Sequence, residues 1–577
     1  MRMRRLQADA AEAADQGGLA AAAAPGREAR TGGLPGWLIA AVPAVAELAV
    51  GGYRIGAPSL WRDEAATISG SQRPVGAIFS LVRNQDAVHG LYYLLMHPLI
   101  AAFGTSETAL RLPSLIAMCL GVGLTAVLGR RLAAAAEMPR PDLVGLLGGL
   151  LLVAVPLTTR YAQEARPYAL TTLFAVLATY LLLHAAERDR WPWWTGYAAA
   201  LALACLFNMF AVLLAAAHGV SLLAARGGSR RPHAERPSSA GLAGDVGGPV
   251  DAAGDVGWTV GHGAATDTRP TVAGRVLWHW LVAGVAAAVV VAPVAFLSAA
   301  QSAQLNWITA PTASTVASLL RDFAGTTLLV PLVGLVALVG CAAGLGIRRG
   351  SGLTLAAVCL PWLVLPPVLL LAVSFAHPLF VERYVVFCLP ALALLTSAGL
   401  VWLGALAGKA ARDRGLTGPQ IKLASVAPPA VLAVAMAAAL IGPQADIRQA
   451  TARPDDLRAV AAVVAAHEKP GDAVIYLPWD AELVGVAYPA PFRSLRDVGH
   501  GESPLTSATI RGLSAAPSIV AARLGGVTRL WTVQWARPLP GESAASESPL
   551  VQRVIAAMHL VRRWRVQSVL LTLYVRR

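Results

Sequence analysis

The amino-acid sequence predicts an all-α polytopic membrane bundle followed by a small C-terminal α/β domain. Of the 577 residues, 56% are hydrophobic and only 14% are charged, whereas a soluble chain carries about 25% charged residues. Long apolar runs, for example residues 143–155 and 353–373, recur through about the first 440 residues. Such runs need lipid on at least one side. Beyond about residue 443 they give way to short helix and strand signals.

The charge pattern argues against a nucleic-acid partner and for a lipid bilayer. The formal net charge is +14, but the arginines form no stripe with interleaved aromatic residues. They follow apolar segments instead, as basic residues do in cytoplasmic loops. All five cysteines lie inside apolar runs without metal-ligand or disulfide spacing, so we expect buried thiols. The basic clusters are Arg130–Arg131, Arg188–Arg190, Arg230–Arg231, Arg348–Arg349 and Lys409–Arg414.

Spans of about 20 apolar residues, with the arginine-rich loops placed inside, predict about eleven transmembrane helices in the plasma (inner) membrane. The N-terminus is then cytoplasmic and the C-terminus extracytoplasmic. Two short spans lie within residues 194–223 and are broken near Asn208. The other spans lie at about residues 37–55, 112–128, 143–157, 168–186, 276–297, 326–347, 353–375, 384–406 and 423–441.

This topology divides the chain into three parts. We expect residues 1–35 to form a disordered cytoplasmic tail, residues 36–442 the transmembrane domain and residues 443–577 an extracytoplasmic α/β domain. Within the transmembrane domain, residues 56–111 form a first outer loop. Residues 226–275 are rich in Gly, Ser, Pro and Asp and are expected to be a disordered cytoplasmic loop.

The C-terminal part repeats a helix-then-strand order three times, which is typical of a small α/β domain. It contains no glycine-rich phosphate loop, no Ser/His/Asp order and no metal-ligand spacing. We therefore expect an accessory role for it rather than catalysis. The predicted helices and strands are residues 454–467 with 473–477, 519–524 with 528–533, and 550–563 with 568–575.

Four polar clusters lie on the outer side of this topology, which makes that side the place to seek function. The first contains Asp63 and Glu64, shortly after the first span. Because adjacent side chains point in different directions, one carboxylate can face a site while the other meets a neighbouring group. A carboxylate near a lipid headgroup can act as general base for a hydroxyl nucleophile. The alternative is a solvated helix start, where both acids favour the helix dipole.

The second cluster places Asp86 three residues before His89. On a helical turn both can face one ligand, as a metal pair or a substrate clamp, and the alternative is an ordinary hydrogen-bonded contact. The third and fourth clusters, residues 160–168 and 377–384, carry arginines on the outer side, against the positive-inside rule. An anionic lipid phosphate explains them, since a guanidinium binds phosphate oxygens bidentately. The alternative is an Arg–Glu pair inside the bundle.

Five motifs follow one another along the chain. They are Asp63-Glu64, Asp86-x-x-His89 before Leu91-Tyr92-Tyr93, Glu107 to Ser114, Glu164 to Tyr168, and Arg383-Tyr384. In this order they resemble the GT-C membrane glycosyltransferases, the group that holds protein O-mannosyltransferases and lipid A aminoarabinose transferases. The resemblance covers roughly residues 37–440. It implies a GT-C-like fold for the bundle.

The resemblance implies transfer of a sugar, mannose or another hexose or pentose, from a polyprenyl-phosphate carrier to an envelope acceptor. That acceptor is a glycan, lipid or protein on the outer face. Asp63 matches the family's catalytic acidic position, as general base, and Glu64 its partner. Asp86 stands where aminoarabinose transferases carry a metal-associated glutamate, and His89 where a proline is usual. The residues implied at the carrier phosphate are Arg166, Arg383 and Arg111, with Glu164, Tyr168 and Tyr384 in the neighbourhood.

These motifs identify no cofactor, and a divalent cation at Asp86 and His89 stays open. Two other classes of function also stay open. A transporter or lipid flippase would show internal repeats and intramembrane charges, whereas this sequence shows no internal repeat and gathers its polar clusters on one side. A non-catalytic envelope scaffold would leave the Asp-Glu and Arg clusters dispensable. The high content of Ala, Arg and Gly suggests a bacterium with a GC-rich genome.

Overall fold

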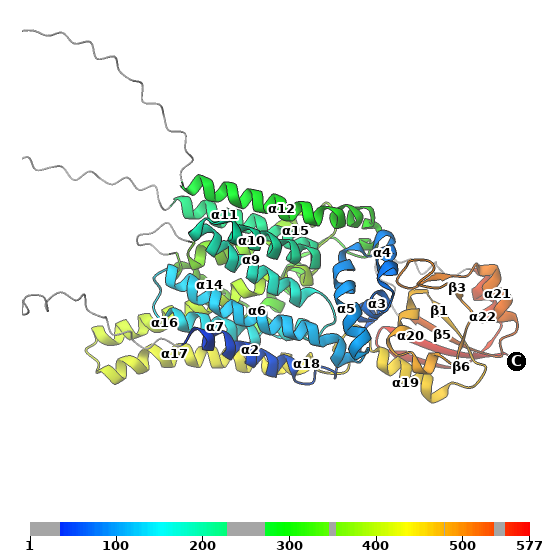
Figure 1. Cartoon of the computed structure of the whole chain (residues 1–577). Helices are drawn as coiled ribbons and strands as arrows, with labels where there is room; N and C mark the ends of the chain where they lie inside the picture. The colour runs from blue at the N-terminus through cyan, green and yellow to red at the C-terminus, as the bar shows by residue number, and fades with distance from the viewer. Residues whose placement is uncertain (1–34, 228–271, 346–352, 478, 536–548, 577) are drawn as a thin grey trace, which may run out of the picture.

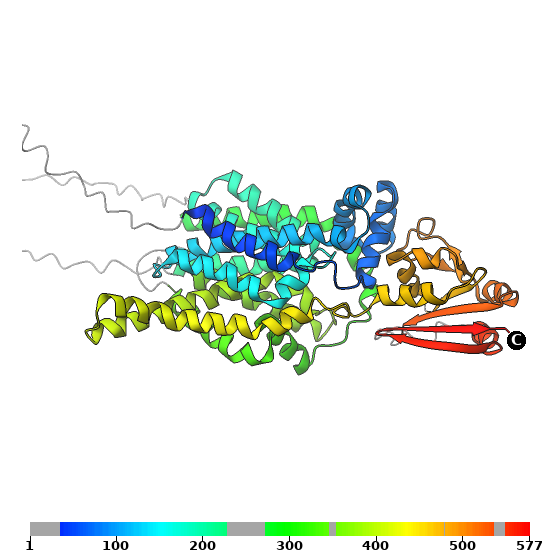
Figure 2. The same ribbon diagram turned by 90° about the horizontal axis from the view of Figure 1, so that it is seen from below.

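The computed structural model describes residues 35–227, 272–345, 353–477, 479–535 and 549–576. The predicted cytoplasmic tail and most of the predicted cytoplasmic loop lie outside these ranges. The described chain forms a helical bundle and a sheet domain that lie end to end (Figure 1). The view from below shows the same elongated arrangement (Figure 2).

The bundle has a helix at each predicted span. In a helix the main-chain donors and acceptors of an apolar run pair with one another, as lipid surroundings require. Three further helices are present: α8 and α13 belong to bent segments, and α18 follows α17 directly. The helices are α2 (Gly36–Gly52), α6 (Glu107–Ala135), α7 (Pro141–Ala154), α8 (Pro156–Ala162), α9 (Tyr168–Arg188), α10 (Trp191–Phe207), α11 (Leu213–Gly227), α12 (Val272–Ala300), α13 (Ala313–Ala324), α14 (Val330–Ala343), α15 (Leu355–Ser374), α16 (Leu389–Asp413), α17 (Gly418–Ala439) and α18 (Ile441–Asp446).

Six of the described helices are long and apolar enough to cross a membrane, and up to eight if each of two bent pairs is one span. The α2 helix has 17 residues, and at about 1.5 Å per residue it is shorter than a hydrocarbon core of about 30 Å. The figure of eleven spans therefore stays a prediction. The predicted break near Asn208 is present, since α10 ends at Phe207 and α11 begins at Leu213.

Both bends arise from local sequence. The α7 and α8 helices meet at 70°, because Pro156 lacks a main-chain donor and keeps Val155 extended, with φ −66° and ψ 121°. Arg160 therefore lies on the bent helix α8. The second bend, of 84°, joins α13 to the segment that contains α14. It follows Gly325, whose φ of +84° belongs to the left-handed region.

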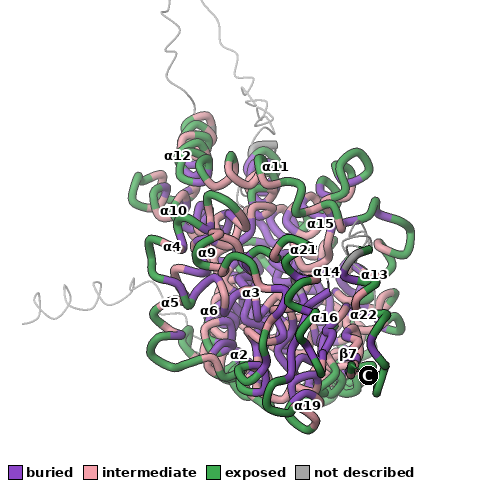
Figure 3. Tube along the Cα trace, turned by 90° about the vertical axis from the view of Figure 1, so that its right-hand side faces the viewer, coloured by how far each residue is buried: buried purple, intermediate pink, exposed green. Residues whose placement is uncertain are grey.

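Small residues bring α14 and α16 into close contact. A Cβ atom added at Gly340 would lie 1.9 Å from the main-chain oxygen of Leu395, and one added at Gly399 would lie 2.0 Å from that of Val336. Membrane helices associate through this kind of close packing. The α12 helix instead lies at the rim of the bundle (Figure 3), and its apolar window is only 17% buried. Its exposed apolar side chains fit a lipid environment.

Short helices lie between the bundle and the C-terminal domain. They are α3 (Arg62–Ser71), α4 (Val75–Asn84), the 3-10 turn η1 (Ala87–His89) and α5 (Gly90–Phe103). Asp63 and Glu64 stand in the first turn of α3, where carboxylates interact favourably with the helix dipole. One hydrophobic core contains residues of α3, α4 and α5 together with residues of the C-terminal sheet. The short helices therefore join the two larger parts of the molecule.

The C-terminal domain is built on a five-stranded sheet with the order β2-β1-β5-β7-β6. β1 pairs in parallel with β2 and β5, whereas β7 pairs antiparallel with β5 and β6. A second, two-stranded sheet is formed by β3 and β4. The elements are α19 (Leu457–His467), β1 (Ala473–Leu477), α20 (Leu483–Ala487), β2 (Arg496–Asp497), β3 (His500–Glu502), β4 (Leu513–Ser514), α21 (Pro517–Gly525), β5 (Arg529–Trp535), α22 (Pro549–Ala556), β6 (His559–Val566) and β7 (Val569–Val575).

The third predicted unit differs from the structure. The helix predicted at residues 550–563 ends at Ala556, and β6 begins at His559. A tight turn through Gln567, with φ +46°, then connects β6 to β7. The short connection favours a hairpin because two-residue turns use positive φ angles. Pairing with β7 thus outweighs the helical spacing of the apolar residues in this segment.

Candidate active site

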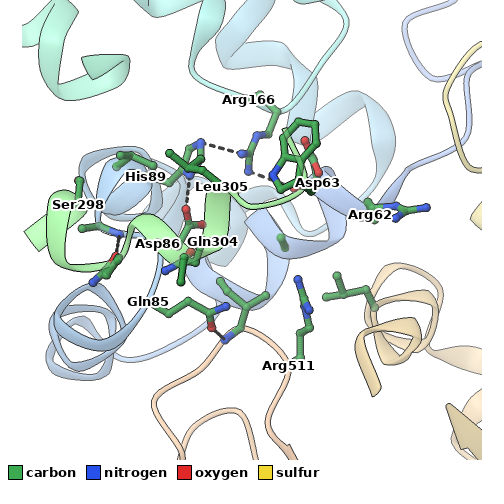
Figure 4. Close-up of a pocket in the computed structure, with 18 of the residues that line it drawn as sticks. Arg62, Asp63, Gln85, Asp86, His89, Arg166, Ser298, Gln304, Leu305 and Arg511 are labelled. Carbon is green, nitrogen blue, oxygen red and sulfur yellow. Dashed lines mark hydrogen bonds and ion pairs between the residues drawn. The ribbon is translucent and has the colours of Figure 1, made fainter. Parts of the chain in front are cut away.

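A cavity of about 670 Å³ lies where the bundle, the short helices and the C-terminal domain meet (Figure 4). Its walls come from segments that are far apart in the sequence. The short helices contribute Trp61, Arg62, Asp63, Ala66 and Gln85 to His89; the bundle contributes Arg166, Ser298, Gln301, Ala303 to Trp307, Arg383 and Tyr384; the C-terminal domain contributes Pro454, Leu483, Ile510 and Arg511.

Asp63 faces this cavity from the first turn of α3. Its side chain keeps 24% of its surface exposed, and its Oδ2 lies 3.9 Å from Nη2 of Arg383. Its main-chain oxygen accepts a hydrogen bond from Nη1 of Arg166 at 3.3 Å. Asp63 therefore meets one guanidinium group through its carboxylate and another through its main-chain oxygen, and the carboxylate is open to a ligand in the cavity.

Glu64 points away from the cavity and is fully buried. Its two carboxylate oxygens accept hydrogen bonds from Nε and Nη2 of Arg111, both at 2.8 Å, and Oε1 also accepts one from the main-chain N–H of Ala165 at 2.9 Å. Burial alone would raise the pKa of Glu64, but the charge and hydrogen bonds of Arg111 outweigh burial and lower that pKa. Glu64 is therefore an ionised, structural residue.

Arg111 does not lie at the cavity where we expected it to bind the carrier phosphate. Besides Glu64, its guanidinium donates to the main-chain oxygens of Ile55, Pro58 and Ser59 at 2.8, 2.9 and 3.1 Å. These contacts use its donors and hold the chain between α2 and α3. Neither Glu64 nor Arg111 lines the cavity, in contrast to the expectation for Arg111, and their pair fixes the position of α3 and with it Asp63.

Asp86, His89 and Arg166 form a hydrogen-bonded chain. Nε2 of His89 lies 2.7 Å from Nη2 of Arg166, and Nδ1 lies 2.6 Å from Oδ1 of Asp86. An arginine can only donate, so Nε2 accepts and the proton of His89 is on Nδ1, donated to Asp86. Tyr93 donates its hydroxyl to the other oxygen of Asp86.

The protonation states in this chain follow from burial and charge. Burial lowers the pKa of His89, and the neighbouring Arg166 lowers it further against the opposing effect of Asp86. Burial opposes ionisation of Asp86, but the contacts with His89, Arg166 and Tyr93 hold its pKa below the ordinary value. The chain thus links an ionised Asp86 through a neutral His89 to Arg166. It fixes the orientation of the arginine side chain.

Arg166 and Arg383 both line the cavity, and the side chain of Arg383 keeps 21% of its surface exposed. The Nε atom of each is buried and has no hydrogen-bond partner among the described residues. Arg383 stacks against Trp307 and Tyr384, with its Cζ 5.4 and 5.8 Å from the ring centres. The two guanidinium groups fit an anion such as a phosphate, whose oxygens accept paired hydrogen bonds.

The contacts of Asp86 and His89 do not fit a metal centre. Both oxygens of Asp86 and both ring nitrogens of His89 take part in the hydrogen bonds already described. Across the described parts of the chain, no group of three or more His, Cys, Asp or Glu side chains is placed to hold a metal ion. We therefore derive no step through a metal.

Two other expected site residues lie behind the cavity wall. Glu164 is 1% exposed and pairs with Arg160, whose Nε lies 3.0 Å from its Oε2. This contact is the Arg–Glu pair within the bundle that was the alternative for the third cluster. Tyr168 is 4% exposed and packs edge-on against Tyr161. Tyr384 does line the cavity, as expected.

Sequence reasoning missed the cavity residues from two regions. The segment between α12 and α13 contributes Trp307 and Gln301, whose side chain bonds to the main chain at Ala87 and Val82. The C-terminal domain contributes Arg511. Nothing in the sequence distinguishes Arg511 from the other arginines of that domain, whereas a tryptophan beside a predicted outer loop could have marked Trp307 as an interface residue.

Arg62, the residue before Asp63, is bound by the C-terminal domain. Arg62 donates from Nε and Nη2 to the two carboxylate oxygens of Asp455, both at 2.9 Å, and its main-chain N–H donates to Asp455 at 3.1 Å. Its guanidinium also lies 3.9 Å from the ring centre of Trp535. The first turn of α3 is thus attached to this domain on one side and to the bundle on the other.

Comparisons with known proteins agree with this architecture. A family model described as dolichyl-phosphate-mannose-protein mannosyltransferase matches residues 90–241. No protein in a collection of curated sequences matches the chain.

Among solved structures, ArnT from Cupriavidus metallidurans in the apo state is similar at 15% identity, with a TM-score of 0.52, over 93% of this chain and 98% of that one. The same protein bound to undecaprenyl phosphate gives 14% identity, a TM-score of 0.50 and 93% and 97% coverage. The archaeal oligosaccharyltransferase AglB from Archaeoglobus fulgidus, in complex with an inhibitory peptide and a dolichol phosphate, gives 11%, 0.46, 93% and 74%. The chain therefore has the GT-C-like fold of ArnT, and its residues 90–241 match the model described as dolichyl-phosphate-mannose-protein mannosyltransferase.

Proposed function

We propose that this protein is a membrane glycosyltransferase that moves a sugar from a polyprenyl-phosphate carrier to a cell-envelope acceptor. The observation that carries the proposal is the position of Asp63 beside Arg166 and Arg383 in the cavity. Such a transfer needs a base for the acceptor hydroxyl and positive charge for the departing phosphate. The fold supports the proposal, since it is shared with an enzyme whose structure holds undecaprenyl phosphate.

Arg166 and Arg383 bind the phosphate of the carrier. Both side chains line the cavity, and the chain from Asp86 through His89 fixes the orientation of Arg166. Two pre-oriented guanidinium groups stabilise the negative charge that grows on the phosphate as it leaves. Binding in this geometry also brings the sugar next to Asp63, which reduces the entropic part of the barrier.

Asp63 acts as the general base. It accepts the proton of the acceptor hydroxyl while that oxygen attacks the anomeric carbon of the sugar. The bond between the anomeric carbon and the phosphate oxygen breaks, and polyprenyl phosphate leaves beside the arginines. One base and one displacement give inversion at the anomeric carbon.

The cavity lies at the outer surface of the plasma membrane in this proposal, and the C-terminal domain is extracytoplasmic. The turn that follows Arg130 and Arg131 lies at the bundle end away from the C-terminal domain, as does the turn at Arg414 (Figure 1). Basic loops favour the cytoplasmic side. The carrier then presents its sugar at the end of the bundle where the cavity is found.

We propose mannose as the donor sugar to test first, because of the family model that matches residues 90–241. The acceptor is an envelope glycan, lipid or protein. A divalent cation at Asp86 and His89 remains a prediction of the sequence, and the hydrogen bonds of the two residues argue against it.

The test is transfer of radiolabelled mannose or arabinose from undecaprenyl phosphate to envelope material of a strain that lacks the protein. Purified wild-type protein in lipid nanodiscs should label the envelope, and mass spectrometry of the deletion strain should show the same sugar missing. The Asp63→Asn protein serves as the inactive control. A wild-type protein that labels nothing with either donor, together with an unchanged envelope in the deletion strain, would contradict the proposal.

A further inference from the structure

The C-terminal domain sends one segment onto the short helices, the hairpin loop 503–512 between β3 and β4. Arg73, just after α3, donates to the main-chain oxygens of Pro504, at 3.0 Å, and of Thr509. Asn84 of α4 donates to the main-chain oxygen of Ala508 at 3.1 Å. Loops are held in one conformation when their main-chain groups are paired in this way.

Ile510, the residue before Arg511, forms hydrogen bonds through both its main-chain N–H and its main-chain oxygen. The main-chain N–H of Ile510 donates to Oε1 of Gln85 at 2.9 Å, and its main-chain oxygen accepts from the hydroxyl of Ser69 at 2.5 Å. Its side chain is 4% exposed and belongs to the core shared with α3 and α5. Gly512 follows with φ +81°, and a Cβ there would lie 2.5 Å from the main-chain oxygen of Glu502. The backbone on both sides of Arg511 is therefore fixed.

Arg511 is placed in the cavity by this arrangement. In Figure 4 its side chain enters from the side of the C-terminal domain, whereas Arg166 enters from the opposite side. Arg166 precedes the bundle helix α9, and Arg383 lies in the 3-10 turn η5 (Glu382–Cys388) that leads into α16. The cavity thus has one cationic wall from the bundle and one cationic residue from the C-terminal domain.

The two sides differ in the ligand that can reach them. A polyprenyl chain stays in the bilayer because of its apolar area, so its phosphate meets the arginines at the ends of bundle helices. The second substrate approaches from the side that faces away from the bilayer, which is the side of Arg511. A guanidinium presents a planar set of donors that suits carboxylate and phosphate groups.

We propose that Arg511 is a specificity-determining residue that binds an anionic group, a phosphate or a carboxylate, of the sugar acceptor. This inference rests on the proposed function and assigns to its cavity the chemistry of the second substrate. The C-terminal domain then contributes a substrate contact to the site instead of serving only an accessory role. Its firm attachment to α3 and α4 gives the distance between Arg511 and Asp63 a fixed value, which positions the acceptor hydroxyl at the base.

The experiment measures initial rates of sugar transfer by wild-type, Arg511→Gln and Arg511→Lys proteins in nanodiscs. The probes are undecaprenyl-phosphate mannose or arabinose and the envelope fraction of the deletion strain. Arg496→Gln is the control, because Arg496 is an exposed arginine of the same domain. Thermal unfolding of all four proteins shows whether the variants are folded.

Arg511→Gln should raise the amount of envelope that gives half the maximal rate by about ten-fold or more, as expected for loss of a charge-assisted hydrogen bond. Arg511→Lys should recover part of this loss. The donor concentration for half-maximal rate should stay within about two-fold of the wild-type value in both variants and in Arg496→Gln. A change in donor dependence instead of acceptor dependence would overturn the proposal.

Treatment of the envelope distinguishes the two anions. Phosphatase digestion removes phosphate groups, and amidation neutralises carboxyl groups. The treatment that removes the recognised group should reduce transfer by the wild-type protein to the level of Arg511→Gln. The same treatment should leave transfer by Arg511→Gln unchanged. If neither treatment affects the wild type more than the variant, the anionic subsite is wrong. Absence of any transfer by the wild-type protein contradicts the proposed function itself, whereas wild-type transfer with normal acceptor dependence in Arg511→Gln contradicts only the role of Arg511.

Discussion

Asp63 and Glu64 are neighbours in the sequence but lie in different environments. Successive side chains on an α-helix point about 100° apart, so in the first turn of α3 one carboxylate faces the cavity and the other faces the interior. Asp63 keeps a partly exposed carboxylate beside Arg383. Glu64 is fully buried in its pair with Arg111. Substitutions at the two positions should therefore affect different properties.

Asp63→Asn should lower the rate of sugar transfer by about 10²–10⁴-fold, the usual contribution of a general base. The amide has nearly the shape of the carboxylate, so the midpoint of thermal unfolding should stay near the wild-type value. The measurement is transfer of radiolabelled sugar by equal amounts of each protein. Full activity of Asp63→Asn would rule out its assignment as the base.

Glu64→Gln should instead destabilise the protein, by about 3–5 kcal/mol, because the buried guanidinium of Arg111 loses its counter-ion. Thermal unfolding measures the effect, with Glu137→Gln as the control since Glu137 is exposed. A Glu64→Gln protein that unfolds like the wild type but transfers no sugar would exchange the roles of the two acids.

His89 should make stability depend on pH. Burial and Arg166 lower the pKa of His89 in the folded protein. In the unfolded chain His89 has its ordinary pKa of about 6.5. As the pH falls below about 6.5, the unfolded chain therefore binds a proton that the folded chain does not. Stability then falls as the pH falls. Gln at this position can accept from Arg166 and donate to Asp86 but does not titrate. The unfolding temperature of wild-type protein should therefore drop more between pH 7.5 and 5.5 than that of His89→Gln, and equal drops would contradict the neutral histidine.

At the scale of elements, the ends of helices carry the charges of the site. Asp63 begins α3, Arg166 precedes α9, and Arg383 lies in the turn before α16. Helix ends leave main-chain groups unpaired and adjoin loops, so polar side chains there meet the cavity and not the lipid. The bundle helices thus act as rigid supports for groups that lie at a single end.

Arg383→Lys should weaken binding of undecaprenyl phosphate by about ten-fold, although the charge is kept, because the ammonium group loses the paired donors and the stacking on Trp307 and Tyr384. Binding of radiolabelled undecaprenyl phosphate to the purified protein measures this. Arg321→Lys is the control, because Arg321 is an exposed arginine of α13. Wild-type affinity in Arg383→Lys would show that Arg383 only supports the wall of the cavity.

At the scale of the whole molecule, the C-terminal domain is attached to the chain at the start of α3 and to the start of α6 through several polar contacts. Besides the Arg62–Asp455 pair, the hydroxyl of Tyr488 accepts from the main-chain N–H of Leu60 at 3.0 Å, and Arg458 pairs with Glu107 at 2.7 Å. The two parts also share a hydrophobic core. Such an interface favours a fixed relative position over independent domain motion.

The orientation in the membrane should place this domain outside the cytoplasm. Reporter fusions at residue 445, within α18 at the end of the bundle, measure it. An export-dependent reporter should be active there, because the basic loops at the opposite end favour the cytoplasm. Activity of a cytoplasmic reporter at residue 445, with a silent export reporter, would place the cavity on the wrong side for the proposed donor.

The sequence by itself determined the bundle helices and the candidate base. Apolar runs form helices in lipid because their main-chain groups find no other partners, and this signal is local. The break near Asn208 and the helix α19 with strand β1 follow from equally local patterns. The candidate Asp63 came from the order of the motifs along the chain.

Only the tertiary structure decided which polar groups meet. Glu64 pairs with Arg111, 47 positions later, so neither residue reaches the cavity, and β6 formed where a helix was expected because β7 pairs with it. Arg511 enters the cavity through a loop in which Ile510 is held by Gln85, 425 positions before Ile510. Local patterns determine helices because the main-chain hydrogen bonds of a helix form within the helix itself. The partners of a buried charge depend instead on packing between segments that are far apart in the sequence.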